Sequence, residues 1–348
     1  MTDLLARLKT EGNPLIDEGG VLFVWSGDSA PYLHLETELF EAVTMEQHAP
    51  DLWIYRLRLP DDAYIEYNFA TTANDPDTIV QDPYNPHHVD TGVGHHNHYV
   101  TMPACIHTPY RIERQGISAG TVTYHRLSDP RFWQAPRDLW LYQPPTDQAV
   151  PLLVVLDGKD YYERGAITTI VDNLIADGLI TPIALALIDN AQTYRMIEYN
   201  QNESIPMFLD GLILPFARQH LKLSDPQGEQ TGTYGILGAS MGGLMALYIG
   251  LRMPDIFGKV IAQAGAFFMY ENDRPALIHL LVDSLPPPTL QIWLDCGTYD
   301  FLYDDNRDML KRLTERGYQR RYTEHHGGHN YTCWRNLLPD ALIYQFGV

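Results

Sequence analysis

The sequence predicts an α/β fold, a mostly parallel β-sheet with helices on both faces, preceded by a small β-sandwich. After about residue 129, continuous apolar runs of strand length alternate with helical stretches, whereas short alternating runs divided by Gly, Asp, Pro and Asn fill residues 20–101. Continuously apolar strands are typical of a parallel sheet covered on both faces, and closely spaced alternating strands are typical of an antiparallel sandwich. We therefore expect two domains, residues 1–110 and residues 111–348.

In the first domain, residues 1–11 predict a short amphipathic helix. The turn-rich and histidine-rich residues 82–98 predict an irregular connecting loop. Strands are expected at residues 21–25, 32–35, 52–59 and 64–69.

In the second domain, apolar residues at helical spacing predict helices over residues 166–176 and 207–221 and a helix that begins near Met241. A last strand is expected to end near His325. The other strands are expected at residues 139–142, 152–156, 183–188, 234–238, 260–263 and 290–294.

The composition excludes several classes of partner. The chain has 24 Lys and Arg against 44 Asp and Glu, a net charge of −20, which repels nucleic acid and anionic membrane surfaces. Its three cysteines are too few and too scattered for a disulfide framework, which indicates a reducing compartment. The first residues lack the features of a signal peptide, and no apolar run is long enough to span a membrane. We expect a cytoplasmic protein.

Histidine is concentrated in the first part of the chain, where nine of the 14 histidines precede residue 130. Adjacent histidines on an extended chain point in opposite directions, and no ligand set with zinc-site spacing is present. We expect no metal and no cofactor. These histidines are then either plain loop residues or part of a wall of a substrate pocket.

The strongest motif is G-x-S-x-G at residues 238–242, which lies between an apolar strand and a helix of small residues. In this motif the serine occupies a tight strand-to-helix turn, and the flanking glycines avoid collisions with the neighbouring backbone. Ser240 is therefore the candidate nucleophile. The alternative is an ordinary glycine-rich turn between a strand and a helix.

A nucleophilic serine needs a base and an orienting acid, which follow it in the order Asp or Glu and then His. Asp300 follows the strand that ends near residue 294, and Asp304 and Asp305 are its competitors. His329 follows a Gly-Gly pair that lets its loop bend, whereas His325 and His326 belong to the end of a strand. Asp300 and His329 are the expected acid and base.

Acyl transfer also requires N–H donors for the developing oxyanion. The residue after the serine, Met241, supplies one donor, and the Lys159 N–H in the loop after the strand at residues 152–156 is the candidate for the second. The neighbouring aromatic residues Tyr161, Tyr162 and Trp334 either stack on an aromatic acyl group or pack in the core.

The stretches Leu156–Gly158, Gly238–Gly243, Cys296–Asp300 and Gly327–Trp334 resemble the esterase-D-type branch of the α/β-hydrolases. This branch includes enterochelin esterases, feruloyl esterases and mycolyltransferases. The front half resembles the immunoglobulin-like early-set domain of enterochelin esterases through three stretches: residues 51–53, 67–69 and 82–86.

The resemblance implies a triad of Ser240, Asp300 and His329, with Lys159 and Met241 as oxyanion donors. It also implies an R-x-x-E element, Arg195 and Glu198, which either binds substrate or forms a structural ion pair that supports the oxyanion loop.

These observations predict a serine carboxylesterase that acts on a small-molecule ester, of siderophore type or of aryl or feruloyl type. The alternatives are a non-catalytic module that binds glycans or proteins, and an acyltransferase. A homo-oligomer is compatible with either class.

Overall fold

The structure is a computed structural model of the 348-residue chain. The structure divides into two compact units. We call Met1–His107 together with Gly297–Phe301 and His325–Cys333 the sandwich unit, and the remaining residues the α/β unit. The residues described are 2–17, 19–38, 42–73, 75–92, 94–129, 136–226, 231–267, 270–271, 274–284 and 289–348.

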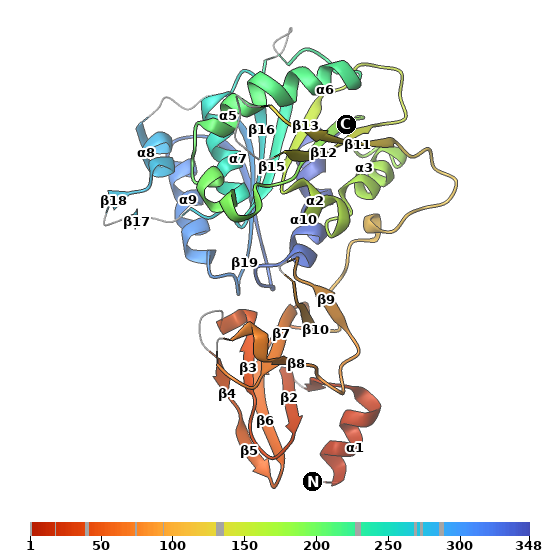
Figure 1. Ribbon diagram of the computed structural model, residues 1–348, viewed down its shortest axis with the longest axis vertical. Coiled ribbons are helices and arrows are strands. Elements are labelled where there is room, and N and C mark those ends of the chain that lie inside the picture. The colour runs from red at the N-terminus through yellow and green to blue at the C-terminus, as the bar shows by residue number, and fades with distance from the viewer. Residues whose placement is uncertain are drawn as a thin grey trace. The chain divides into compact units, whose positions relative to one another are not determined.

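The sandwich unit consists of helix α1 (Thr2–Glu11) and antiparallel sheets in the orders β1-β2-β6-β5 and β4-β3-β7-β10-β9, with β8 paired to β7 (Figure 1). Its strands are β1 (Leu15–Asp17), β2 (Gly20–Ser26), β3 (Tyr32–Leu35), β4 (Val43–Thr44), β5 (Glu46–Ala49), β6 (Leu52–Arg58), β7 (Tyr64–Ala70), β8 (Ile79–Val80), β9 (His88–Asp90) and β10 (His96–Thr101).

The core of this unit lies between its sheets. Phe23 of β2 meets Tyr67 of β7 edge to face, with ring centroids 4.9 Å apart. On the other face of β2, Leu22 packs with Leu8 of α1. The alternating side chains of β2 thus serve two apolar clusters, which confirms the predicted β-rich front region and its N-terminal helix.

The predicted irregular loop over residues 82–98 is only partly correct. Its end belongs to β10, which pairs with β7 through Val100 opposite Ile65. His98 is buried, and its Nε2 accepts a hydrogen bond from the Asp82 N–H at 3.0 Å. His98 and Val100 are two positions apart on one strand, so their side chains lie on the same face of the sheet. This histidine is therefore structural.

The α/β unit is built on a sheet in the order β11-β12-β14-β13-β15-β16-β19-β20. The pairs of β11 with β12 and of β12 with β14 are antiparallel, whereas β14, β13, β15, β16 and β19 run parallel. The strands are β11 (Thr121–Leu127), β12 (Arg137–Gln143), β13 (Leu152–Leu156), β14 (Ala184–Ile188), β15 (Tyr234–Ala239), β16 (Phe257–Gln263), β19 (Gln291–Gly297) and β20 (Gln319–His325), with a separate ribbon of β17 (Tyr270–Glu271) and β18 (Arg274–Pro275).

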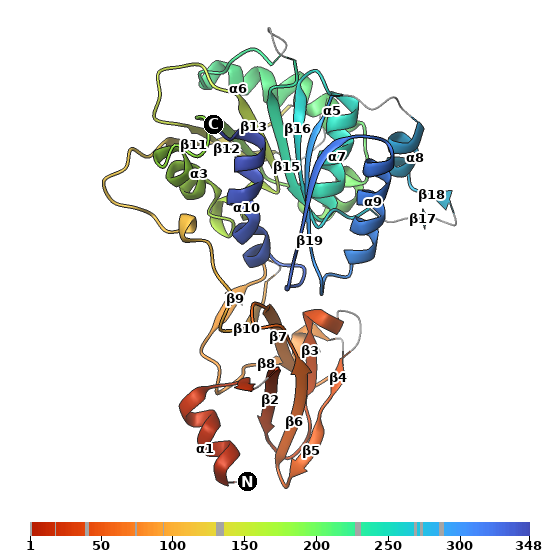
Figure 2. The same cartoon turned by 180° about the vertical axis from the view of Figure 1, so that it is seen from behind.

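Helices cover both faces of this sheet, as predicted. Helix α7 contacts Val260 through Gly250, and helix α10 contacts Gly235 through the ring of Phe346, from the opposite face (Figures 1 and 2). The helices are α2 (Gly158–Glu163), α3 (Ile167–Ala176), α4 (Arg195–Tyr199), α5 (Ser204–Phe208), α6 (Leu214–His220), α7 (Met241–Arg252), α8 (Leu277–Ser284), α9 (Tyr303–Glu315) and α10 (Tyr331–Phe346).

The expected helix over residues 207–221 is interrupted. A π-helical segment, Leu209–Ile213, joins α5 to α6 and keeps Leu209 and Ile213 buried.

The predicted α/β class with its mostly parallel sheet is confirmed. Among the described helices, none has the length and apolar character needed to cross a membrane.

Candidate active site

Ser240 lies at the turn between β15 and α7, with φ 57° and ψ −123°. Its N–H donates to the Gln263 carbonyl at 2.9 Å, and its carbonyl accepts from the N–H groups of Leu244 and Ala266, each at 3.0 Å. A positive φ strains a residue that carries a Cβ, and it persists only where the surroundings fix it. These hydrogen bonds hold the serine in the conformation expected of a nucleophile elbow.

The glycines beside Ser240 are required by close backbone contacts. A Cβ on Gly238 would lie 2.2 Å from the Gly242 carbonyl oxygen, and one on Gly243 would lie 3.0 Å from the Cα of Gly265. Any larger residue at position 238 would therefore open the turn. The motif is a sterically determined elbow rather than a generic glycine-rich turn.

The structure brings Asp300 and His329 together. Asp300 Oδ2 lies 2.7 Å from Nδ1 of His329, and the Asp300 carboxylate is fully buried. The ring of Phe301 packs against the imidazole with centroids 4.8 Å apart. A carboxylate at Nδ1 fixes the ring and its tautomer, and it leaves Nε2 for proton transfer.

The competing histidines have other surroundings. Both ring nitrogens of His325 are buried, and no described residue offers either of them a hydrogen bond. Burial lowers the pKa of His325 to about 4, so its ring is a weak base. His326 is bound through Nδ1 to Asp62 at 2.7 Å. Of the three histidines, His329 is the one hydrogen-bonded to the predicted acid.

The competing aspartates, Asp304 and Asp305, lie in the first turn of α9. Carboxylates at that position stabilise the partial positive charge of a helix N-terminus. Their location therefore has a local structural explanation.

The oxyanion candidates lie at the starts of two helices. Lys159 is in the first turn of α2 and Met241 opens α7, and backbone N–H groups at these positions have no intrahelical acceptor. Gly158 is sterically required, since a Cβ there would lie 2.2 Å from the Leu187 carbonyl carbon. The loop residue Asp157 approaches the elbow, with Oδ2 3.0 Å from the position of a Cβ on Gly242.

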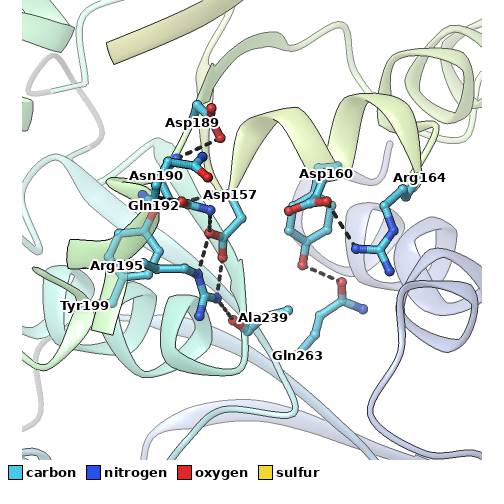
Figure 3. A network of polar contacts seen from close by, with 11 residues as sticks. Asp157, Asp160, Arg164, Asp189, Asn190, Gln192, Arg195, Tyr199, Ala239 and Gln263 are labelled. Atoms are coloured by element: carbon cyan, nitrogen blue, oxygen red, sulfur yellow. Dashed lines mark hydrogen bonds and ion pairs between the residues drawn. The ribbon is translucent and has the colours of Figure 1, made fainter. Parts of the chain in front are cut away.

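Arg195 fixes this loop, as Figure 3 shows. Its Nε donates to Oδ1 of Asp157 at 2.7 Å and its Nη2 donates to Oδ2 at 2.6 Å. Asn190 donates to Oδ1 of the same carboxylate at 2.8 Å. Asp157, which is 1% exposed, has φ 53° and immediately precedes α2. A buried carboxylate with several charge-assisted donors is well compensated.

Arg195 and Glu198 do not form a pair with each other. Glu198 is buried against Arg137 of β12, and burial raises its pKa despite that partner. Arg195 instead holds Asp157, so the ion pair that supports the oxyanion loop has a different acidic partner from the one expected. A substrate-binding role for Arg195 and Glu198 stays a prediction. Sequence reasoning missed the role of Asp157, although its position two residues before Lys159, the predicted oxyanion donor, was a usable signal.

The two aromatic side chains chosen as substrate contacts lie in the core. Tyr161 is fully buried and its hydroxyl donates to Gln263 at 2.9 Å, and Trp334 is 4% exposed. This burial favours core packing, the other interpretation, for both rings. The substrate role of Tyr161 and Trp334 stays a prediction.

Sequence reasoning also missed a buried polar network beneath the elbow. The Gln263 side chain accepts from Tyr161 and donates to Asp295 Oδ2 at 3.0 Å, and Trp293 donates to the same oxygen at 2.7 Å. Because the Gln263 carbonyl also binds the Ser240 N–H, this network connects α2 with the nucleophile turn. Polar residues at the ends of apolar strands were the only signal in the sequence.

The described residues contain no group of three or more His, Cys, Asp or Glu side chains that could hold a metal ion.

The fold and the serine elbow define an α/β-hydrolase. The Esterase family matches residues 134–345, which is more than half of the chain. The chain therefore belongs to the Esterase family, and the predicted resemblance to esterases of this fold is confirmed.

Similar proteins include an iron(III) enterobactin esterase of Escherichia coli K12, 26% identical over 60% of this chain and 53% of that protein. An iron(III) salmochelin esterase of Escherichia coli O6:H1 is 28% identical over 59% of this chain and 53% of that protein. The chain thus spans about half the length of these curated relatives.

Solved structures share the fold over more of the chain. The ferric enterobactin esterase of Salmonella typhimurium has a TM-score of 0.81 at 21% identity, covering 99% of this chain and 98% of that one. The enterobactin esterase of Shigella flexneri has a TM-score of 0.76 at 20% identity, covering 93% and 92%. A similarity of this extent includes the β-rich front region as well as the α/β unit.

Proposed function

We propose that this protein is a serine carboxylesterase with Ser240 as nucleophile, His329 as general base and Asp300 as the residue that orients the base. The observation that carries the proposal is Ser240 itself, held at positive φ between β15 and α7 in a chain of the Esterase family. The hydrogen bond between Asp300 and His329 supports it independently.

In the proposed reaction, His329 Nε2 takes the proton of Ser240 as Oγ forms a bond to the ester carbonyl carbon. The carbonyl oxygen becomes an oxyanion, and the N–H groups of Lys159 and Met241 stabilise it. Collapse of this intermediate breaks the ester C–O bond, and the imidazolium returns its proton to the departing alcohol. Water then repeats the sequence on the acyl-enzyme, which releases the acid and restores Ser240.

The buried pairs of the α/β unit support these roles. The donor loop is fixed through Asp157 and Arg195, and the nucleophile turn is fixed through the Gln263 carbonyl. Donors that are already in place need no reorganisation when the oxyanion forms, which is the main requirement for electrostatic stabilisation of the transition state.

We propose an aryl ester of feruloyl type as the preferred substrate class, with a siderophore-type triester as the alternative. Relatives are named for enterobactin and salmochelin, and a structural neighbour is a ferulic acid esterase with a TM-score of 0.55. Two cations near the donor loop, Arg195 and Arg164, are each bound to a carboxylate, Asp157 and Asp160. With a net charge of −20, the chain favours a weakly charged ester over a strongly anionic ferric catecholate.

The test compares the protein with Ser240→Ala on p-nitrophenyl acetate, a feruloyl ester and a ferric catecholate triester. We expect Ser240→Ala to lower kcat by about three orders of magnitude or more on every substrate, without loss of the folded state. Turnover retained by Ser240→Ala in a clean preparation would contradict the mechanism. A higher kcat/KM for the ferric triester than for the feruloyl ester would favour the siderophore-type substrate instead.

A further inference from the structure

The loop that carries His329 contacts the strands of the front region within the sandwich unit. The Tyr64 N–H at the start of β7 donates to the His326 carbonyl at 2.9 Å, and Tyr64 forms an isolated parallel bridge with Gly327. The Asp62 carboxylate binds the His326 ring at 2.7 Å. The loop is thus hydrogen-bonded to residues more than 200 positions earlier in the chain.

A single side chain of the front region, Glu36, reaches the residues on both sides of His329. The Asn330 amide donates to Oε1 of Glu36 at 2.9 Å and to Oε2 at 3.2 Å. On the other side, a Cβ on Gly328 would lie 2.7 Å from the Glu36 Cβ and 2.9 Å from Oε2. Gly328 therefore lies directly against the Glu36 side chain.

Both ends of this contact are fixed. Oε2 of Glu36 also accepts from the Glu66 N–H on β7 at 2.8 Å. Asn330 uses its carbonyl oxygen to accept from the Cys333 N–H at 2.9 Å, at the start of α10. Glu36 is thus anchored to a strand, and Asn330 to the first turn of a helix, with His329 adjacent to that anchor.

Glu36 carries an energetic penalty at this location. Burial, together with the nearby Glu66 carboxylate, raises its pKa well above the ordinary value for glutamate. A buried carboxyl group is tolerated where donors compensate for lost hydration, and the Asn330 amide and Glu66 N–H supply them here.

We propose that Glu36 is a positioning residue for His329, acting through its hydrogen bond with Asn330. The inference rests on the proposed function, in which His329 is the general base. Asp300 fixes the imidazole from its Nδ1 side, and Glu36 fixes the backbone that carries it. A displacement of a catalytic group by about 1 Å is sufficient to lower the reaction rate by about a hundredfold.

The test uses two isosteric changes and their combination. Glu36→Gln keeps an oxygen for the Glu66 N–H but replaces the other oxygen, which accepts from the Asn330 amide at 2.9 Å, with an NH2 group. Two hydrogen-bond donors, the new amide and the Asn330 amide, then face each other. Asn330→Asp keeps an acceptor for the Cys333 N–H but places a carboxylate opposite Glu36. In the double variant, the new glutamine amide donates to the new aspartate while its carbonyl accepts from the Glu66 N–H. The hydrogen bond is restored with reversed polarity.

We expect each single change to lower kcat by about tenfold or more with KM within about twofold, and the double variant to recover most of the loss. The fold-loss in kcat should be the same for p-nitrophenyl acetate and for a feruloyl ester, because hydrolysis of both requires the same base. The exposed Glu46 on β5 provides a matched control, since Glu46→Gln changes the same group on the same unit without a described contact to this loop.

Singles that retain wild-type kcat, or a double variant slower than both, would overturn the inference. A loss confined to the bulky ester, seen mainly in KM, would also overturn it, because it would assign Glu36 to the substrate surface. Ser240→Ala separates these outcomes from the proposed function: a wild-type rate in the single variants with an inactive Ser240→Ala rejects only the role of Glu36.

Discussion

Arg195 holds Asp157 through two parallel hydrogen bonds of 2.7 and 2.6 Å, and Asp157 is the residue immediately before the donor helix α2. The guanidinium also stacks near the Tyr199 ring, at 5.3 Å from its centroid. Such a planar, bidentate pair fixes direction as well as distance. Arg195 is therefore placed to orient the loop that carries the Lys159 N–H.

Arg195→Lys is expected to lower kcat by about tenfold or more while KM changes little. Lysine keeps the charge but offers a single ammonium in place of the fork, so the orientation of Asp157 is lost. The Lys159 N–H then stabilises the oxyanion less well, and an interaction needed only in the transition state appears in kcat. Steady-state kinetics with p-nitrophenyl acetate measure the effect.

The control for this variant is Arg312→Lys, which alters a guanidinium that bridges two carboxylates, Asp283 on α8 and Asp308 on α9. We expect wild-type kinetics from it. A rise in KM for Arg195→Lys at constant kcat would show that Arg195 contacts substrate.

The free energy of unfolding is expected to be about 1 kcal/mol higher for Ser240→Gly than for Ser240→Ala. At φ 57° and ψ −123° any Cβ is strained by about 1–3 kcal/mol, and glycine removes this strain at the expense of a more flexible unfolded chain. Both variants lack the proposed nucleophile, so activity does not complicate the comparison. Urea denaturation of the two proteins measures it, and equal stabilities would show that the strain at this turn does not exceed the entropic cost of glycine.

Much of the fold was predictable because its signals are local. The apolar run of β15, the glycines at positions 238 and 242 and the small residues of α7 are adjacent in sequence, and a Cβ on Gly238 would collide with the Gly242 carbonyl. Ser240 and Asp300 could be chosen because each follows an apolar strand of the predicted parallel sheet, where such folds carry their functional residues.

The parts that sequence reasoning missed depend on contacts between distant residues. Arg195 is closer in sequence to Glu198 than to Asp157, and only the folded arrangement of β13 and β14 decides between these partners. The Asp300 and His329 loops were assigned by sequence to residues 111–348, yet they cluster with the front region. Tyr299 packs against that region's core, and Glu36 binds Asn330. No periodicity encodes such contacts. The boundary at residues 110 and 111 stays a prediction.

The three histidines near the end of β20 should differ sharply on replacement. His329→Ala is expected to lower kcat by about three orders of magnitude, because it removes the proposed base. His326→Ala removes an exposed contact with Asp62, for which we expect a loss of less than about tenfold. Parallel assays of both variants on p-nitrophenyl acetate test this ranking, and similar losses would show that the base is wrongly assigned.

His325 predicts a pH dependence of stability. Burial lowers its pKa from 6.5 to about 4, so between these values the unfolded chain binds a proton that the folded protein does not. Stability therefore rises with pH across this window and is lost as the pH falls through it. The difference corresponds to at most about 3 kcal/mol between pH 6.5 and pH 4.

The contribution of His325 is isolated by comparison with His325→Leu. The buried ring nitrogens have no described hydrogen-bond partner, so an apolar side chain of similar size loses little at neutral pH. We expect the two proteins to have similar melting temperatures near pH 7.5, and the leucine variant to become relatively more stable as the pH falls toward 4.5. Thermal unfolding at a series of pH values measures the difference, in which the other titrating groups cancel. A difference that stays constant with pH would show that His325 is protonated in the folded protein as readily as in the unfolded chain.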